Sequence, residues 1–256
     1  MQFGVELKAS LVYGNIMEII KYYHHRGNID EISSRYHAFA KLKHAKITSS
    51  HLQWRNKRDG TLSHHTQAAF FGKSGYGKSS TVNAFFGNSI LKTSDVAACT
   101  RECQSLDFKL SQDCYLSLAD FPGIGENEYR DKEYLKMYSD FLASSTVVVY
   151  VIRADTRDYT IDESAYQKVF PAYTDKKKVI FALNCCDKIE PISRSYSSEP
   201  STEQMRNIDK KINSVSTIFN PHNNVIPYSA ETRWNMNHLA NEIVRIISND
   251  EHIIMR

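Results

Sequence analysis

A glycine-rich segment at residues 72–79 has the residue types and spacing of a phosphate-binding loop, G-x-x-x-x-G-K-[ST]. Glycines let the backbone wrap closely enough for several N–H groups to converge on phosphate oxygens, and the following helix points its positive end at the anion. Lys78 would neutralise the β- and γ-phosphates, and the Ser79 hydroxyl would ligate Mg²⁺. The predicted nucleotide-binding residues here are Gly72, Ser74, Gly75, Tyr76, Gly77, Lys78, Ser79 and Ser80.

Two further segments could complete a magnesium and γ-phosphate site. Asp120 opens a D-F-P-G sequence 41 residues after the loop serine, at the expected end of a strand. Its carboxylate can hold Mg²⁺, and the Gly123 amide can donate to a γ-phosphate oxygen that only a triphosphate carries. Thr100 can complete the magnesium shell, although Thr93 and Ser94 compete for that role. With Lys78, the catalytic candidates are Thr100 and Gly123.

A purine-reading sequence follows a predicted buried strand at residues 179–183. It is N-C-C-D-K at residues 184–188, with Lys188 counted in the candidate site. The Asp187 carboxylate can accept from guanine N1–H and N2–H₂ together, whereas adenine would leave its oxygens unpaired. Asn184 would contact N7 and brace the loop. The alternative interpretation is a surface turn in which Asp187 caps a helix.

Ser229 and Ala230 follow the next predicted strand, where the Ala230 amide can contact guanine O6. The three-residue sequence S-A-E at 229–231 is weak evidence alone, and its value comes from its position after the last predicted strand. An ATP-binding protein is the alternative that Asp187 disfavours.

Strands and helices that alternate from residue 66 onward would position these segments. The pattern predicts a three-layer α/β fold with a mostly parallel sheet, in which ligands bind at the carboxyl ends of the strands. Expected strands are 68–71, 105–110, 114–118, 146–152, 179–183 and 224–228; expected helices are 78–86, 129–142, 161–170, 202–219 and 234–247.

The first 65 residues differ from the remainder. They contain ten Lys or Arg against five Asp or Glu, although the whole chain of 256 residues has a net charge of only +3. Apolar residues at 12–23 and 29–39 recur at helical spacing, and Asn28 with Glu31 fits a capping box. We therefore expect a basic helical segment over 1–65, which could approach RNA, a ribosomal particle or an anionic membrane, with a solvated helical surface as the plainer alternative.

Composition is that of a globular protein, with 41% apolar and 24% charged residues. No run of eighteen apolar residues predicts a transmembrane helix, and no basic-then-apolar leader is evident. The five cysteines lack zinc-site spacing, so we expect reduced thiols, with disulfides or a bound metal as the alternative. We expect a cytoplasmic location, with peripheral membrane association as the alternative.

The order and spacing of the five motifs resemble the TRAFAC-class GTPases, and their Era-like branch in particular. The N-C-C-D-K-I-E-P sequence at 184–191 looks more narrowly like the YfjP/YeeP-type bacterial GTPases, often carried by prophages. The resemblance implies a Ras-like P-loop G domain over 66–256 and Mg²⁺-dependent hydrolysis of GTP to GDP. A nucleotide-dependent homodimer is a further expectation.

Two residues depart from the pattern of that class. GTPases of the class usually have a lysine, whose stem packs over the purine, where Cys185 stands. Ile124 follows Gly123, where Ras-type sites use a glutamine to orient water. The expected function is therefore a switch with slow intrinsic turnover, and a guanine-nucleotide-binding module with little hydrolysis is the alternative.

Overall fold

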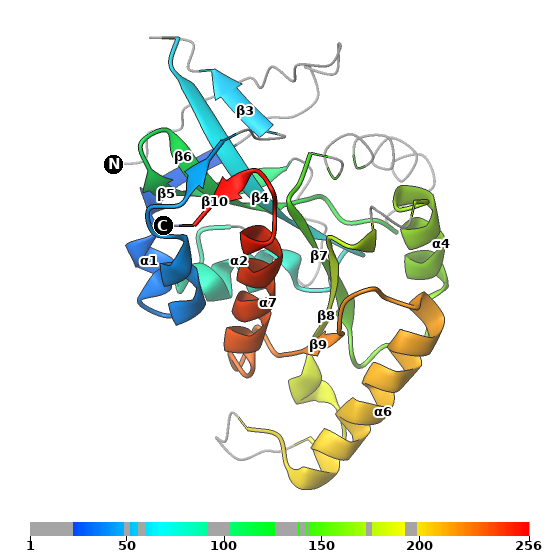
Figure 1. Cartoon of the computed structure of the whole chain (residues 1–256). Helices are drawn as coiled ribbons and strands as arrows, with labels where there is room; N and C mark the ends of the chain where they lie inside the picture. The colour runs from blue at the N-terminus through cyan, green and yellow to red at the C-terminus, as the bar shows by residue number, and fades with distance from the viewer. Residues whose placement is uncertain are drawn as a thin grey trace.

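A mostly parallel sheet, flanked by helices on both faces, organises the computed structural model (Figure 1). The structure describes residues 23–48, 52–55, 60–91, 103–125, 138, 142, 144–172, 176–192 and 199–255. The strands are β1 (Tyr23–Asn28), β2 (Lys46–Ile47), β3 (Leu52–Arg55), β4 (Leu62–Phe71), β5 (Gln104–Ser111), β6 (Cys114–Asp120), β7 (Val147–Arg153), β8 (Val179–Asn184), β9 (Ile226–Pro227) and β10 (Ile253–Ile254). The helices are α1 (Asp30–Ser33), η1 (His37–Leu42), α2 (Lys78–Phe86), α4 (Thr160–Val169), η2 (Cys186–Lys188), α6 (Thr202–Phe219) and α7 (Met236–Ser248).

The order of the strands in the main sheet is β1-β5-β6-β4-β7-β8-β9, and β3 pairs with β4 outside this path. The β5–β6 and β3–β4 pairs are antiparallel, and the other pairs of this sheet are parallel. The predicted three-layer α/β fold and its hairpin are therefore confirmed. The carboxyl ends of β4, β6, β7 and β8 lie along one edge, where the polar motifs follow.

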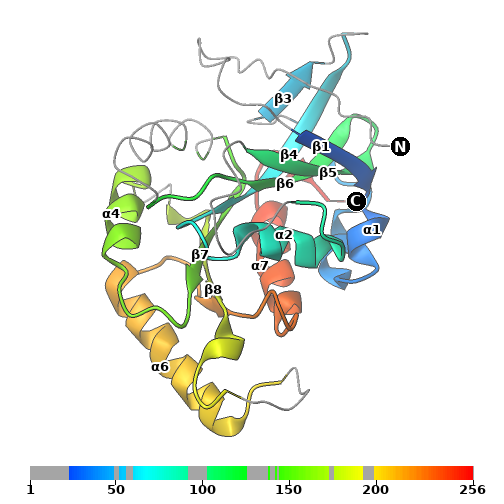
Figure 2. The same cartoon turned by 180° about the vertical axis from the view of Figure 1, so that it is seen from behind.

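Successive side chains of β4 point to opposite faces of the sheet and contribute to the core on both. Phe70 packs toward α2, with its ring centroid 6.2 Å from that of Phe85. Phe71 faces the opposite way and makes an edge contact with Tyr150 at 4.9 Å. Successive strand residues point to opposite faces, so this pair anchors both helical layers. Figures 1 and 2 show α1, α2 and α7 on one side and α4 and α6 on the other.

The expectation of a wholly helical segment over 1–65 is wrong for the part that the structure describes. β1 and β3 are strands, and β4 begins at Leu62, so the boundary drawn between 65 and 66 falls inside a strand. β1 pairs along all six of its residues with β5. Backbone pairing with an exposed sheet edge decides this conformation, because it does not need an apolar side-chain pattern. Most of the predicted helix over 12–23 lies outside the described residues.

The second predicted helix of that segment is present but short. Its capping interaction exists, since the Asn28 amide donates to Glu31 Oε1 at 2.8 Å, yet α1 ends at Ser33. Its apolar face is buried as the periodicity predicts. Tyr36 donates its hydroxyl to the Ala84 carbonyl oxygen at 3.0 Å, so this segment packs directly on α2.

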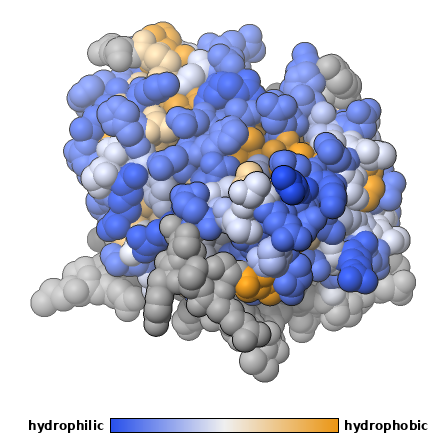
Figure 3. All heavy atoms as spheres, turned by 90° about the horizontal axis from the view of Figure 1, so that it is seen from below, coloured by the Kyte–Doolittle hydropathy of each residue, from blue (hydrophilic) through white to orange (hydrophobic). Residues whose placement is uncertain are grey.

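Five large apolar side chains are exposed among the described residues, namely Ile90, Ile161, Ile192, Ile218 and Ile254. The face seen from below carries only small, separated apolar areas among hydrophilic residues (Figure 3). The described part contains no helix long and apolar enough to cross a bilayer. Among the described residues, Cys114, Cys185 and Cys186 are free cysteines.

Candidate nucleotide-binding site

The phosphate loop connects the end of β4 to the start of α2. Gly77 precedes the helix with a left-handed φ of 86°, and a Cβ there would come 2.4 Å from Asn184 Nδ2. Both the dihedral and the close approach require glycine. Lys78, 6% exposed, is the first residue of α2, and its Nζ donates to the Lys73 carbonyl oxygen at 3.1 Å. The loop thus presents a glycine-lined helix start with a lysine beside it, as an anion site needs.

Two oxygen donors meet where the sequence predicted magnesium. The Ser79 hydroxyl donates to Asp120 Oδ2 at 2.5 Å, and Asp120, at the end of β6, is fully buried. The parallel pairing of β4 with β6 creates this proximity, because both strands end at the same edge. A hydroxyl and a carboxylate are hard oxygen ligands of the kind Mg²⁺ takes, so the residues present fit that ion.

The loop after β6 lies directly against the phosphate loop. The Ser74 amide donates to the Ile124 carbonyl oxygen at 2.9 Å, and the Ile124 amide donates to the Gly72 carbonyl oxygen at 3.3 Å. A Cβ on Gly123 would stand 2.5 Å from Ser74 Cα and 2.6 Å from its nitrogen. Only glycine allows this contact, so the Gly123 backbone lies directly against the phosphate loop.

Asn184, 3% exposed, joins the phosphate loop to the loop after β9. Its Nδ2 donates to the Tyr76 carbonyl oxygen at 3.0 Å, and its Oδ1 accepts from the Ala230 amide at 3.0 Å. The structure therefore brings together three motifs that the sequence places far apart. The bracing role expected of Asn184 is visible in these two bonds.

The Asp187 carboxylate has the chemistry that guanine recognition requires. Within the part of the chain that the structure describes, its Oδ1 is buried and has no hydrogen-bond partner. A buried acceptor without a donor is costly, and a guanine N–H would satisfy it. Lys188, beside it in η2, is exposed.

Gln204, on α6, holds this loop in shape and was missed in the sequence. Its Nε2 approaches three loop carbonyl oxygens, those of Cys186 at 3.3 Å, Asp187 at 3.4 Å and Ile189 at 2.8 Å. The residue is 3% exposed. Nothing in a helical periodicity marks a glutamine for this task, because the contact depends on how α6 packs.

The loop after β9 is fixed at its start. The Tyr228 hydroxyl lies 2.8 Å from Thr81 Oγ1 on α2, and burial raises the pKa of Tyr228 well above its usual range. Ser229 is fully buried and accepts from the Thr232 amide at 3.1 Å. Ser229 therefore shapes the turn, and Ala230 presents its amide toward Asn184.

Cys185 occupies the class lysine position in a left-handed conformation, with φ 62°. Burial raises the pKa of its thiol to about 11, against the opposing charges of Arg153 and Lys188. Burial also raises the pKa of Cys186 to about 12. Both groups are thus neutral thiols at physiological pH, and neither supplies the cation that a lysine would.

A buried carboxyl group under the phosphate loop was also missed in the sequence. Asp162, in the first turn of α4, is fully buried and accepts from the Tyr76 hydroxyl at 3.0 Å. Burial raises its pKa to about 6, although the Tyr76 hydrogen bond and the charges of Lys73 and Lys78 oppose that shift. Its place in an amphipathic helix gave no sign of this contact.

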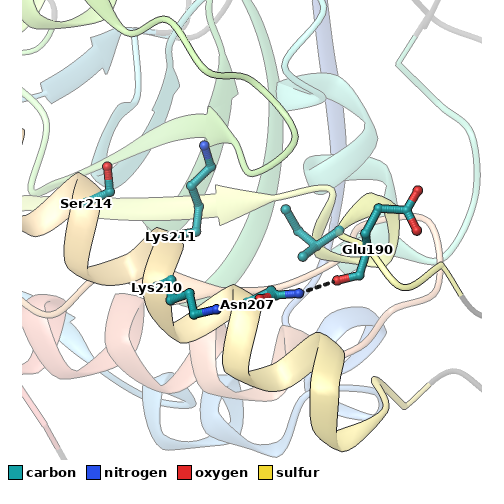
Figure 4. Close-up of a pocket in the computed structure, with 6 residues that line it drawn as sticks. Glu190, Asn207, Lys210, Lys211 and Ser214 are labelled. Carbon is teal, nitrogen blue, oxygen red and sulfur yellow. Dashed lines mark hydrogen bonds between the residues drawn. The ribbon is translucent and has the colours of Figure 1, made fainter.

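A groove of about 360 Å³ lies between the loop after β8 and α6 (Figure 4). Asn207 spans it by donating to the Glu190 carbonyl oxygen at 2.8 Å. No phosphate-loop residue lines it, so it stands apart from the predicted site. Its lining residues are Ile189, Glu190, Asn207, Lys210, Lys211 and Ser214.

Thr100, predicted to complete the magnesium shell, lies outside the described residues, as do Thr93 and Ser94. Its role stays a prediction. The predicted helix over 129–142 lies mostly outside them as well.

Comparison with known proteins agrees with this geometry. Residues 67–185 match the family described as 50S ribosome-binding GTPase. This span includes the phosphate loop, Thr100 and Asp120 to Gly123, and it ends before Asp187 and before the loop after β9. This part of the chain is therefore similar to a GTPase domain of that family.

Two proteins of Escherichia coli K12, both named as uncharacterized, are similar in sequence to this chain. YkfA is 38% identical over 177 residues, which cover 69% of this chain and 60% of YkfA. YfjP is 35% identical over 178 residues, with the same coverage of 69% and 60%. The chain thus spans less than two thirds of either relative. The sequence-based resemblance to YfjP is confirmed.

Solved structures place the GTPase domain in the same fold. The crystal structure of Aquifex aeolicus Era bound to GDP·AlF₄⁻ aligns with a TM-score of 0.59 and 22% identity, covering 73% of this chain and 58% of Era. A second Era structure, in complex with MgGDPNP and nucleotides 1506–1542 of 16S ribosomal RNA, aligns at 0.58 with 22% identity and covers 72% and 57%. At this identity the likeness establishes the fold.

Proposed function

We propose that this protein binds GTP with Mg²⁺, hydrolyses it slowly to GDP and phosphate, and acts as a nucleotide-state switch. The observation that carries the proposal is the buried, unpartnered Asp187 oxygen, considered within the described residues, three positions after the Asn184 bridge. An acceptor for guanine and a clamp on the phosphate loop occur in one short segment. A phosphate-binding loop alone would not select this base.

The chain's own residues provide position and charge for the reaction. Lys78 and the phosphate-loop amides neutralise the leaving phosphate, and the Gly123 backbone couples the γ-phosphate position to the loop after β6. Ser79 and Asp120 would hold Mg²⁺, which supplies charge neutralisation at the phosphates when bound. Loss of the γ-phosphate would release the Gly123 loop, and this release is the proposed switch.

Slow turnover is proposed from Ile124. Its side chain is apolar and the residue is 2% exposed, with both backbone groups bonded to the phosphate loop. It cannot orient a water molecule as a glutamine would, so an accelerating group must come from elsewhere.

The direct test is GTP turnover by purified protein with Mg²⁺, with Lys78→Ala and the exposed Lys168→Ala as a matched pair. We expect turnover that Lys78→Ala abolishes, that Lys168→Ala retains, and that excess ATP does not inhibit. Equal use of ATP would overturn the assignment of Asp187. Tight GTP binding without turnover would favour the alternative, a guanine-nucleotide-dependent assembly or binding module, which Ile124 also supports.

The partner is proposed to be RNA or a ribosomal particle. Support comes from the excess of basic residues over 1–65 and from Era, which one structure holds in complex with a 16S ribosomal RNA segment. Binding that weakens with salt and depends on nucleotide state would support it. A homodimer that forms only with GTP, or binding to anionic vesicles, would instead support assembly or a membrane surface. A cytoplasmic location is part of the same proposal.

A further inference from the structure

Arg153 is the last residue of β7 and stands between the two halves of the proposed nucleotide site. In the parallel pairing of β7 with β8 it lies opposite Asn184. The next residue donates its amide to the Asn184 carbonyl oxygen at 2.8 Å. Arg153 therefore emerges at the edge where base-reading and phosphate-binding loops meet, although no motif of the sequence marks it.

Hydrogen bonds hold the Arg153 guanidinium in one orientation. Nε donates to Asp155 Oδ1 at 2.8 Å and Nη2 donates to Asp155 Oδ2 at 2.6 Å, which is a two-point ion pair. Nη1 reaches the Gly75 carbonyl oxygen of the phosphate loop at 3.4 Å. These bonds lie in the plane of the guanidinium and do not occupy its faces, so the flat group is fixed with faces able to stack.

The charge of Arg153 acts on the position where the class lysine is missing. It lowers the pKa of the Cys185 thiol against the larger effect of burial, and the pairing of β7 with β8 places Arg153 opposite Asn184, the residue before Cys185. The hydrogen bonds from Arg153 to the Asp155 carboxylate hold the pKa of Asp155 below its usual range. A cation anchored by a carboxylate thus stands next to a neutral Cys185.

We propose that Arg153 binds the guanine base through a face of its guanidinium, and so supplies from β7 the cationic cover that Cys185 does not supply. The inference rests on the proposed function, since it needs guanine at Asp187. An arginine stacks on aromatic faces and offers a positive charge to the ring, and such contacts change affinity by about threefold to thirtyfold. Asp187 would then recognise the edge of the guanine ring, and Arg153 would cover one face of the same ring.

The test is calorimetric binding of GDP and GTP to the full chain and to variants at positions 153, 157 and 185. We expect Arg153→Ala to weaken both nucleotides about tenfold and by the same factor, since the base is common to them. The matched control is Arg157→Ala, an exposed arginine four residues later, which should bind as the unmodified protein does. Cys185→Lys in the Arg153→Ala background should restore affinity to within about threefold.

Three results would overturn the inference: unchanged affinity in Arg153→Ala, a loss that grows from GDP to GTP and so reports a phosphate contact, or a loss that Cys185→Lys does not restore. Should Arg153→Ala fail to fold, Arg153→Gln removes the charge and keeps a donor toward Gly75, and the same comparisons apply. Absence of any guanine-nucleotide binding by the unmodified protein would instead refute the proposed function. Binding that needs Asp187 but is indifferent to Arg153 would refute only this inference.

Discussion

The Tyr76 hydroxyl donates to Oδ2 of the buried Asp162 carboxyl group at 3.0 Å, which fastens the middle of the phosphate loop to the first turn of α4. Tyr150 strengthens the same point, since its hydroxyl donates to the Asp162 carbonyl oxygen at 2.9 Å. The loop is thus held from below by α4 and from the side by Asn184. A loop restrained in this way enters nucleotide binding largely preorganised.

Tyr76→Phe is expected to lower the free energy of unfolding by roughly 1–3 kcal/mol, because it removes the donor to a buried charged acceptor. Urea denaturation at pH 8 measures this change. In an Asp162→Asn background the same substitution should cost about half as much, since a neutral acceptor makes a weaker bond. Equal losses in both backgrounds would mean that the hydroxyl does not act through the carboxylate.

The free energy of unfolding should depend on pH through the protonation of Asp162. Burial raises its folded pKa from 3.8 to about 6, so the folded state binds the proton more tightly than the unfolded state does. The stabilisation is complete below pH 3.8 and is lost as the pH rises through 6. The unfolding free energy of the unmodified protein, relative to Asp162→Asn, should fall by about 1 kcal/mol between pH 5 and 7.5. A constant difference across that range would contradict the raised pKa.

Asp187→Asn is expected to exchange guanine for xanthine as the preferred base. The amide keeps one acceptor and gains one donor, and xanthine offers an oxygen where guanine has its N2 amino group. GTP binding should weaken at least about a hundredfold while XTP binding improves, both measured by competition against labelled nucleotide. Equal weakening of both nucleotides would place Asp187 outside the base contact.

Gln204→Ala should weaken GDP binding by about tenfold, although Gln204 belongs to none of the nucleotide-binding motifs. The substitution releases three loop carbonyl oxygens, so Asp187 is less firmly presented. Asn207→Ala, on the same helix, is the matched control, because it removes only an exposed bond to Glu190. An equal effect of the two substitutions would show that α6 acts through its general packing.

Much of this fold could be predicted because the strands are apolar and the motifs follow them directly. The run at 146–152 and the helix pattern at 202–219 correspond to β7 and α6 almost residue for residue. Asp120 and Asn184 could be found because each is the last residue of such a strand, β6 and β8.

β1 could not be predicted in the same way. Its sequence, Y-H-H-R-G-N, has neither an apolar alternation nor a helical stripe, and its conformation comes from pairing with β5. Asp162, Gln204 and Arg153 were missed for a related reason. Each also contacts a loop of the site that is distant in sequence, and the residues next to it in the chain do not reveal that contact.

The two hydrogen bonds of the Asn184 side chain limit how the sequence of such a protein can change in evolution. One carboxamide donates to Tyr76 and accepts from Ala230, and a longer glutamine would displace both partners. No other natural side chain of this length offers a donor and an acceptor together. A substitution at position 184 would therefore alter the phosphate loop and the base-binding loops together. Changes that affect only one of these loops must occur at the residues around Asn184.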